Sequence, residues 1–224
     1  MNNPAANLPG GLRIIICALL MLLTGACTSS LNLKVESEVP TPVVTRLPLN
    51  MGVYYDQQFS NYTYKEDSAE RHNWSIESGA SQVAMFERIL PSMFRNVKVI
   101  KAPPTTGKSY NVDGIMVPDI EEMQFSLPSE TKLDLYEVWI KYKIGLYDNR
   151  GELITDIPLT AYGKTPTEFM LTRDKAMQAA MDQALRDAGA RMALGFTQDK
   201  EVQEWLRAKG ICGGNTNVNC QATP

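Results

Sequence analysis

The segment that most constrains the fold is residues 136–147, in which two kinds of side chain alternate without a break. One side carries Tyr136, Val138, Ile140, Tyr142, Ile144 and Leu146, and the other carries Glu137, Trp139, Lys141, Lys143, Gly145 and Tyr147. This period of two predicts a strand with one buried face and one largely wet face, as in an antiparallel sheet covered on one side. A tight turn follows at 148–151, where Gly151 suits a positive φ, and a returning strand carries Leu153, Ile157, Leu159 and Ala161. The chain is therefore expected to form a long hairpin here.

Shorter alternating segments predict the remaining strands. They lie at 31–36 and 49–55, with a short strand near 62–64 to which 74–76 pairs back, a short buried strand at 97–100, and strands at 112–117 and 123–127. Pro118 is expected to interrupt the last pair as a bulge or an edge position, because proline donates no ladder hydrogen bond.

Two longer helices are predicted from apolar residues spaced three and four apart. The first begins at Ser78 and buries Val83, Phe86, Leu90 and Met93, with a kink or a new turn expected at Pro91. The second is capped by Thr172, has Asp174 in its first turn and carries a stripe of small and apolar residues: Met177, Ala180, Ala184, Leu185, Ala188 and Met192. A shorter helix at 200–209 ends at Gly210. These elements predict a two-layer α+β domain with a largely antiparallel sheet and two main amphipathic helices on one face.

The beginning of the chain is typical of an exported protein. A polar stretch with a single cation, Arg13, precedes the apolar run 14–23 and the small residues 24–26. This is the pattern of a secretory signal peptide, and the apolar run is shorter than the ~20 residues that a membrane span needs. An ordinary signal peptide cut at Ala26 and a buried core helix are the alternatives.

Cys27 directly follows the small residues, and the segment therefore resembles a bacterial lipoprotein signal, although Thr24 stands where such signals usually have Leu. The resemblance implies cleavage before Cys27 and acylation of that cysteine, which anchors the protein in a membrane. Thr28, in place of the Asp that tends to retain lipoproteins in the inner membrane, implies the inner leaflet of the outer membrane, facing the periplasm. The expected division is a signal peptide at 1–26, a single α+β domain at 27–210 and a C-terminal tail at 211–224.

Two cysteines remain in that tail. Cys212 and Cys220 flank a polar segment, and in an exported protein such a pair favours a disulfide that closes a small loop. Free thiols or a metal site are the alternatives, but no histidine lies nearby in the sequence.

Composition and motifs disfavour several functions. Removal of residues 1–26 takes away one cation and leaves a net charge of 21 − 25 = −4, so nucleic-acid binding is not expected. The loop 102–109 loosely matches a phosphate-binding loop, but Pro103 and Pro104 lack amide donors and a strand follows, so nucleotide binding is not expected. His72 is the only histidine and is interpreted as a solvated loop residue. We expect no catalytic residues, no metal and no cofactor.

Three acids and two aromatic residues remain to be interpreted. Asp119, Glu121 and Glu122 are read as a charged edge rather than as an acid pair or a metal site. Trp139 and Tyr147 are expected on the outer face of the long strand, where exposed aromatic residues can mark a partner surface. The alternative is that a second layer of the protein covers them.

The hairpin, from 136–142 to 159–163, and the alanine-rich helix after it resemble those of small outer-membrane lipoproteins of proteobacteria, among them transport-auxiliary and envelope-assembly lipoproteins. The resemblance implies a non-enzymatic protein that docks on an envelope complex and supports transport or assembly. A lipid or small-ligand carrier, with a cavity between sheet and helices, and an envelope hydrolase are the alternative hypotheses.

Overall fold

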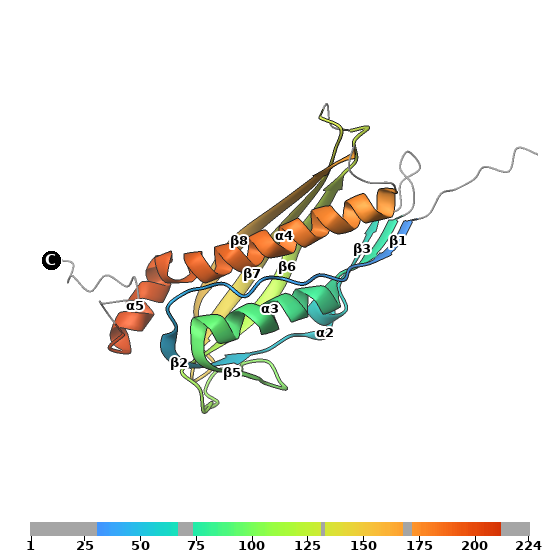
Figure 1. Ribbon diagram of the computed structural model, residues 1–224. Helices are drawn as coiled ribbons and strands as arrows, with labels where there is room; N and C mark the ends of the chain where they lie inside the picture. Colours follow the sequence, from blue (N-terminus) through green and yellow to red (C-terminus); the bar gives the residue numbers. More distant parts are fainter. Residues whose placement is uncertain (1–30, 67–73, 131–132, 168–171, 212–224) are drawn as a thin grey trace, which may run out of the picture.

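A computed structural model describes residues 31–66, 74–130, 133–167 and 172–211. Figure 1 shows two long helices lying across one face of a sheet, with a smaller group of strands beside them. The strands are β1 (Leu31–Lys34), β2 (Leu47–Val53), β3 (Thr63–Glu66), β4 (Trp74–Glu77), β5 (Phe94–Val99), β6 (Gly114–Ser126), β7 (Leu135–Asp148) and β8 (Leu153–Pro166). The helices are α2 (Gln57–Ser60), α3 (Gly79–Met93), α4 (Arg173–Gly195), the 3-10 turn η2 (Phe196–Gln198) and α5 (Lys200–Ala208). The expected α+β class is confirmed.

The strands form two sheets, where the sequence predicted a single one. The larger has the order β5-β2-β6-β7-β8 and the smaller β1-β4-β3. The long pairs β6–β7 and β7–β8 are antiparallel, but β2 is parallel to both β5 and β6. The chain between β2 and β5 passes through α3, and such a crossover returns it in the same direction. Alternation along a strand reveals its buried face, but it does not reveal which strand will be its neighbour.

The predicted hairpin is confirmed as β7 and β8. Its turn is held by the Asp148 carboxylate, which accepts hydrogen bonds from the amides of Arg150 at 2.7 Å and Glu152 at 2.9 Å, and Gly151 has φ +73°. On the returning strand, Ile157, Leu159 and Ala161 are buried, whereas Leu153 is 52% exposed. The pairing shifts between Leu146 and Tyr147, and such a shift moves the following side chains to the opposite face.

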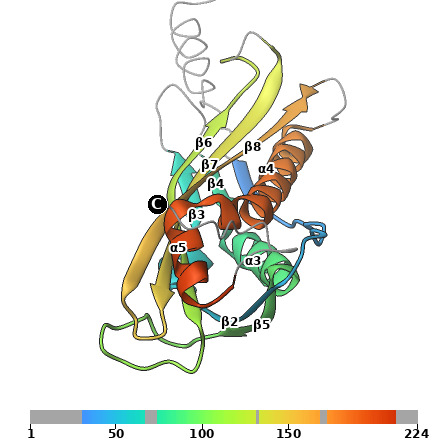
Figure 2. The same ribbon diagram turned by 90° about the vertical axis from the view of Figure 1, so that its left-hand side faces the viewer.

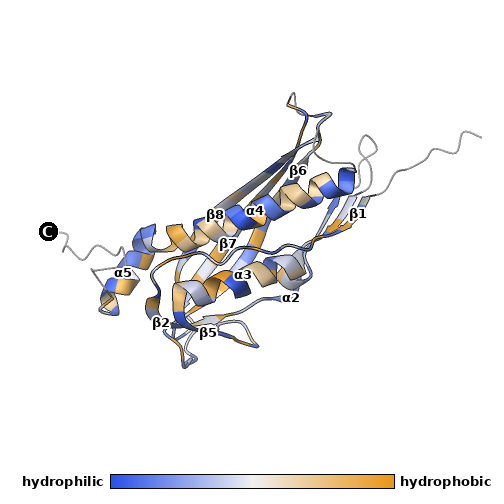
Figure 3. Ribbon diagram, viewed as in Figure 1, coloured by the Kyte–Doolittle hydropathy of each residue, from blue (hydrophilic) through white to orange (hydrophobic). Residues whose placement is uncertain are grey.

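Helix α4 covers the inner face of the hairpin, as predicted. Thr172 accepts a hydrogen bond from the amide of Lys175 at 3.4 Å, and the expected stripe of alanine, leucine and methionine residues is buried. The small residues allow close contact, because a Cβ built on Gly163 of β8 would lie only 2.0 Å from the carbonyl oxygen of Ala180. Figure 3 shows apolar residues of the strands beneath the two long helices.

Helix α3 differs from the prediction at its ends. The Ser78 side chain makes no capping hydrogen bond, and its amide instead donates to the carbonyl of Tyr62 at 3.0 Å. Val83 is half-buried and packs at the margin of the core. Pro91 does not divide the helix, since it lies in the last turn and the helix ends at Met93.

Pro118 was expected to interrupt the ladder, but β6 is continuous through it. The carbonyl of Met116 accepts a hydrogen bond from the Tyr54 amide at 2.9 Å on the β2 side of the strand. The backbone nitrogen of residue 118, two positions later, points to that same side, beyond the end of β2. Proline is tolerated there because no ladder partner is lost, and the bulge lies instead between Ile120 and Glu122.

Strand β5 was expected to be buried, but it is an edge strand with Val99 56% exposed. Its buried contact comes from Phe94, whose ring packs edge-on against that of Phe196 at 5.3 Å. The sequence prediction also missed the short helix α2, which Asp56 caps by accepting a hydrogen bond from the Phe59 amide at 2.6 Å. Among the described residues, no helix combines the length and the hydrophobicity needed to cross a membrane.

Candidate functional site

The outer face of the large sheet, opposite the helices, is divided into a covered half and an open half. Figure 2 shows the long connection between β5 and β6 running beside the strands at one end of the sheet. Under this connection Ile115 is fully buried, and Val112 of the connection itself is only 8% exposed. A Cβ built on Gly52 would lie 3.3 Å from Ile115 and 3.4 Å from Ile100. We call this region the covered half.

Hydrogen bonds fasten the 100–113 connection to the hairpin turn. The amide of Gly107 donates to the carbonyl of Arg150 at 2.9 Å, and the amide of Tyr110 donates to that of Asn149 at 2.8 Å. Residues 102–109, which loosely match a phosphate-binding loop, are an irregular surface segment packed on the turn, and no helix begins there. Their position therefore fits a structural role in covering the sheet.

Tyr147, one of the two aromatic residues expected at a partner surface, lies in the covered half. It pairs with Ile115 across β6 and β7 and is half-buried. Its ring lies over the backbone of Gly145, where a Cβ would be only 2.8 Å from it. The side chain is thus held against the sheet as part of the outer packing.

Trp139, the other aromatic residue, lies in the open half and is 44% exposed. Its ring is 4.3 Å from that of Tyr162 on β8, at an angle of 39°. The strand register places Gln124, Trp139 and Tyr162 side by side across three strands. We define the open half by its outward side chains, which are Glu122, Gln124, Glu137, Trp139, Lys141, Thr160 and Tyr162.

Polar groups surround this aromatic pair. The Tyr162 hydroxyl donates a hydrogen bond to Glu137, the Gln124 amide donates to Glu122, and Lys141 forms an ion pair with Glu121 at 2.9 Å. A shallow hollow of about 160 Å³ beside Trp139 is lined by Glu122, Gln124, Ile140, Lys141 and Thr160. An aromatic centre with a polar rim is the anatomy of many protein-binding surfaces.

The electrostatics of the open half follow from these contacts. Burial, followed by the hydrogen bond to Glu137 and its negative charge, raises the pKa of Tyr162 to about 12. The hydrogen bond between Lys141 and Glu121 raises the pKa of the lysine and lowers the pKa of the carboxylate. The tyrosine is therefore a neutral hydrogen-bond donor, and the Lys141–Glu121 pair is charged at neutral pH.

Helix α4 fixes the position of β8 and thereby of Tyr162. The amide of Tyr162 donates to the Asp187 carboxylate at 3.0 Å, and the amide of Lys164 donates to the Gln183 side chain at 3.3 Å. Both amides lie on the free side of an edge strand, so the helix replaces a neighbouring strand. The aromatic pair is consequently held on a rigid element.

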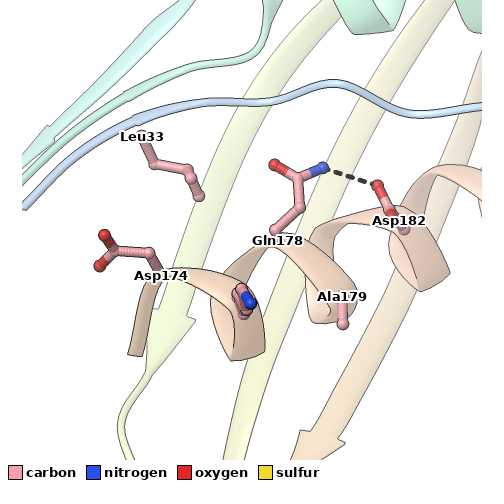
Figure 4. A pocket seen from close by; sticks show the side chains of 6 residues that line it. Leu33, Asp174, Gln178, Ala179 and Asp182 are labelled. Carbon is pink, nitrogen blue, oxygen red and sulfur yellow. Dashed lines mark hydrogen bonds between the residues drawn. The ribbon is translucent and has the colours of Figure 1, made fainter. Parts of the chain in front are cut away.

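A second hollow, of about 390 Å³, lies between β1 and the first turns of α4 (Figure 4). Leu33 and Ala179 line it together with charged and amide side chains. The Gln178 amide donates to the carbonyl of Glu36 at 2.7 Å and to Asp182 at 2.8 Å, and so ties the helix to the segment after β1. The hollow is open to solvent, whereas the carrier hypothesis requires an enclosed apolar cavity between the sheet and the helices.

The other residues that the sequence analysis singled out either make contacts of their own or lie outside the described ranges. Glu121 pairs with Lys141, and the described residues contain no group of three or more metal-ligating side chains. Cys27, Cys212, Cys220 and His72 all fall outside the described residues. The predicted lipidation and disulfide therefore stay predictions.

The sequence prediction missed Tyr162, although a signal for it was present. Position 162 alternates with Ala161 and Gly163, which face α4. That alternation places Tyr162 on the outer face, but counting back from the turn at 148–151 does not find its partner, because the register shift between Leu146 and Tyr147 is what brings Tyr162 opposite Trp139.

Comparisons with known proteins add the following. No family model and no curated protein matches the chain. Among solved structures, a Xanthomonas campestris protein assigned to family DUF330 is 12% identical, with a TM-score of 0.48 over 74% of this chain and 92% of that one. A minor lipoprotein from Acinetobacter baumannii is 8% identical, with a TM-score of 0.38 over 67% and 95%. Lipoprotein B from Nitrosomonas europaea is 15% identical, with a TM-score of 0.36 over 79% and 95%. Because these TM-scores lie below 0.5, the likenesses establish neither the family nor the function of this chain.

Proposed function

We propose that the chain is a non-enzymatic, lipid-anchored protein of the bacterial outer membrane that docks on an envelope protein complex through the open half of its sheet. The observation that carries the docking role is the exposed Trp139–Tyr162 pair, held on a rigid hairpin and rimmed by polar groups. Tryptophan and tyrosine are the residues that most often dominate binding energy at protein interfaces.

The anchor supports this role by its position. Only three residues separate Cys27 from Leu31, where β1 begins, so four Cα steps span at most about 14 Å. Acylation of Cys27 would therefore keep the β1 end of the molecule close to the membrane. The open half lies at this end, because Tyr64 of the small sheet packs 4.9 Å from Phe125, which neighbours Gln124 on β6.

The packing between sheet and helices disfavours the carrier hypothesis. Where β8 meets α4, the carbonyl oxygen of Ala180 lies 2.0 Å from a Cβ position on Gly163, so the two backbones leave no room for a ligand. The hydrolase hypothesis needs a clustered acid pair or an activated nucleophile. The acids in the open half, Glu137 and Glu122, are hydrogen-bonded to Tyr162 and Gln124, and the adjacent Glu121 pairs with Lys141.

Membrane anchoring and docking are tested separately in cells. The first test is mass spectrometry of the purified N-terminus, which should show a triacylated Cys27, and Cys27→Ser should release the protein from the outer-membrane fraction. An unmodified N-terminus would contradict the anchor without affecting the docking surface.

The docking test places a photocrosslinking residue at Thr160, in the hollow beside Trp139. One stoichiometric envelope protein should crosslink, and Trp139→Ala should remove that product. Leu153→Ala is the matched control, because Leu153 is similarly exposed but lies outside the open half. Equal crosslinking in both variants, or turnover of cell-wall fragments by the purified protein, would contradict the proposal.

A further inference from the structure

The two edges of the large sheet differ in their capacity to receive another strand. At β8, the amides of Tyr162 and Lys164 are already bonded to the α4 side chains Asp187 and Gln183. An added strand would have to displace these bonds and the helix that supplies them. The β8 edge is therefore closed at Tyr162 and Lys164.

At β5 the opposite edge is free. The amide of Ile100 donates to the carbonyl of Val53 at 2.9 Å, which shows that Ile100 and, two residues earlier, Lys98 direct their backbone groups toward β2. The amides and carbonyls of Val97 and Val99 must then point away from the sheet. Within the described ranges, no residue hydrogen-bonds to them on that side. Such a row of unpaired backbone groups is a template for strand addition.

The charge at this edge indicates what kind of strand would fit. The segment 94–101 carries Arg95, Lys98 and Lys101 and contains no acidic residue. Beside it, a hollow of about 330 Å³ is lined by Lys98 and by the side-chain amides of Asn50, Asn96 and Asn111. Like charges placed opposite one another are destabilising, so pairing of β5 with β5 of a second copy is disfavoured. An acidic segment would instead place carboxylates against the cations.

We propose that the free edge of β5 binds an extended acidic segment of a protein partner by strand addition. The ladder would form through the backbone of Val97 and Val99. The carboxylates of the incoming strand would lie near Arg95, which precedes these two residues, and near Lys98, which lies between them. This site is separate from the open half and does not depend on the proposed lipid anchor.

The test uses the full chain in detergent micelles and a defined probe, the acetylated heptapeptide Glu-Val-Glu-Val-Glu-Val-Glu. Amide hydrogen exchange should already be slow at Lys98 and Ile100 in the free protein. On addition of the peptide, exchange at Val97 and Val99 should slow by about tenfold, which corresponds to ~1.4 kcal/mol of added protection. The lysine-for-glutamate version of the peptide should have no such effect.

Two variants decide whether the edge itself is the site. Val97→Pro removes an outward amide, which an edge strand tolerates, whereas Val97→Thr keeps both that amide and a β-branched side chain. Binding should be lost in the first variant and retained in the second, and Lys98→Glu should weaken it. The proposal is overturned if the acidic peptide does not bind at millimolar concentration, if Val97→Pro binds it as well as the parent does, or if both peptides bind equally.

Discussion

The covered and open halves of the outer sheet face share strands β6 and β7, yet they have different surroundings. In the covered half, Ile115 is fully buried by the 100–113 connection, and Tyr147 is pressed against Gly145. In the open half, Trp139 stays 44% exposed, and its ring lies beside that of Tyr162. The alternating pattern of β7 is the same in both halves. An aromatic residue on the polar side of a strand therefore indicates a partner surface only where no other segment of the chain covers it.

The largest effect should come from the covered half. Ile115→Ala should lower the free energy of unfolding by about 2–5 kcal/mol, because it leaves a cavity beneath the 100–113 connection. Chemical denaturation measures this loss. If Ile115→Ala lowered the free energy of unfolding no more than Trp139→Ala does, the expected difference between the covered and open halves would be contradicted.

A smaller effect is expected where Tyr147 covers the sheet. Gly145→Ala places a Cβ 2.8 Å from the Tyr147 ring, which must move outward. The loss of stability should be about 1–3 kcal/mol, the usual cost of overpacking. Tyr147 should also become more accessible to solvent, which iodination or NMR can detect. Unchanged accessibility would show that the ring does not depend on Gly145 for its position.

Trp139→Ala should affect stability less still. The ring is partly exposed and its main partner is Tyr162, so the expected loss is about 1 kcal/mol, the size of an aromatic pair contribution. The same variant should abolish the crosslink from Thr160. A large loss of stability together with the lost crosslink would mean that Trp139 acts through folding and not through docking.

The smallest effect is a titration. Tyr162 should ionise near pH 12, against an ordinary pKa of 10.0. Because the raised pKa favours the neutral form in the folded state, its contribution to stability is complete below pH 10 and is lost as the pH rises from about 10 to about 12. In Glu137→Gln the pKa should fall, but it should stay above 10 because burial is the largest cause. Ultraviolet absorbance of the phenolate measures both values, and an unchanged pKa in the variant would exclude the Tyr162–Glu137 contact.

The predictions that succeeded concern local periodicity and local hydrogen bonding. Residues close together in the sequence are enough to predict these features. They are the β7–β8 hairpin, its Gly151 turn, the Thr172 cap and the alanine stripe of α4. The failures concern neighbours distant in sequence. The edge position of β5, the second sheet and the unbroken passage of β6 through Pro118 depend on which strand lies alongside, and no pattern within one strand encodes that.

The candidate site divides in the same way. The sequence by itself determined that Trp139 and Tyr147 share the outer side of one strand, because side chains alternate between the two faces of a strand. Only the tertiary structure decided that Tyr147 is packed while Trp139 is open and joined by Tyr162. The physical reason is that burial depends on the path of the 100–113 connection, which crosses the sheet at one end and is held there by the backbone of the hairpin turn.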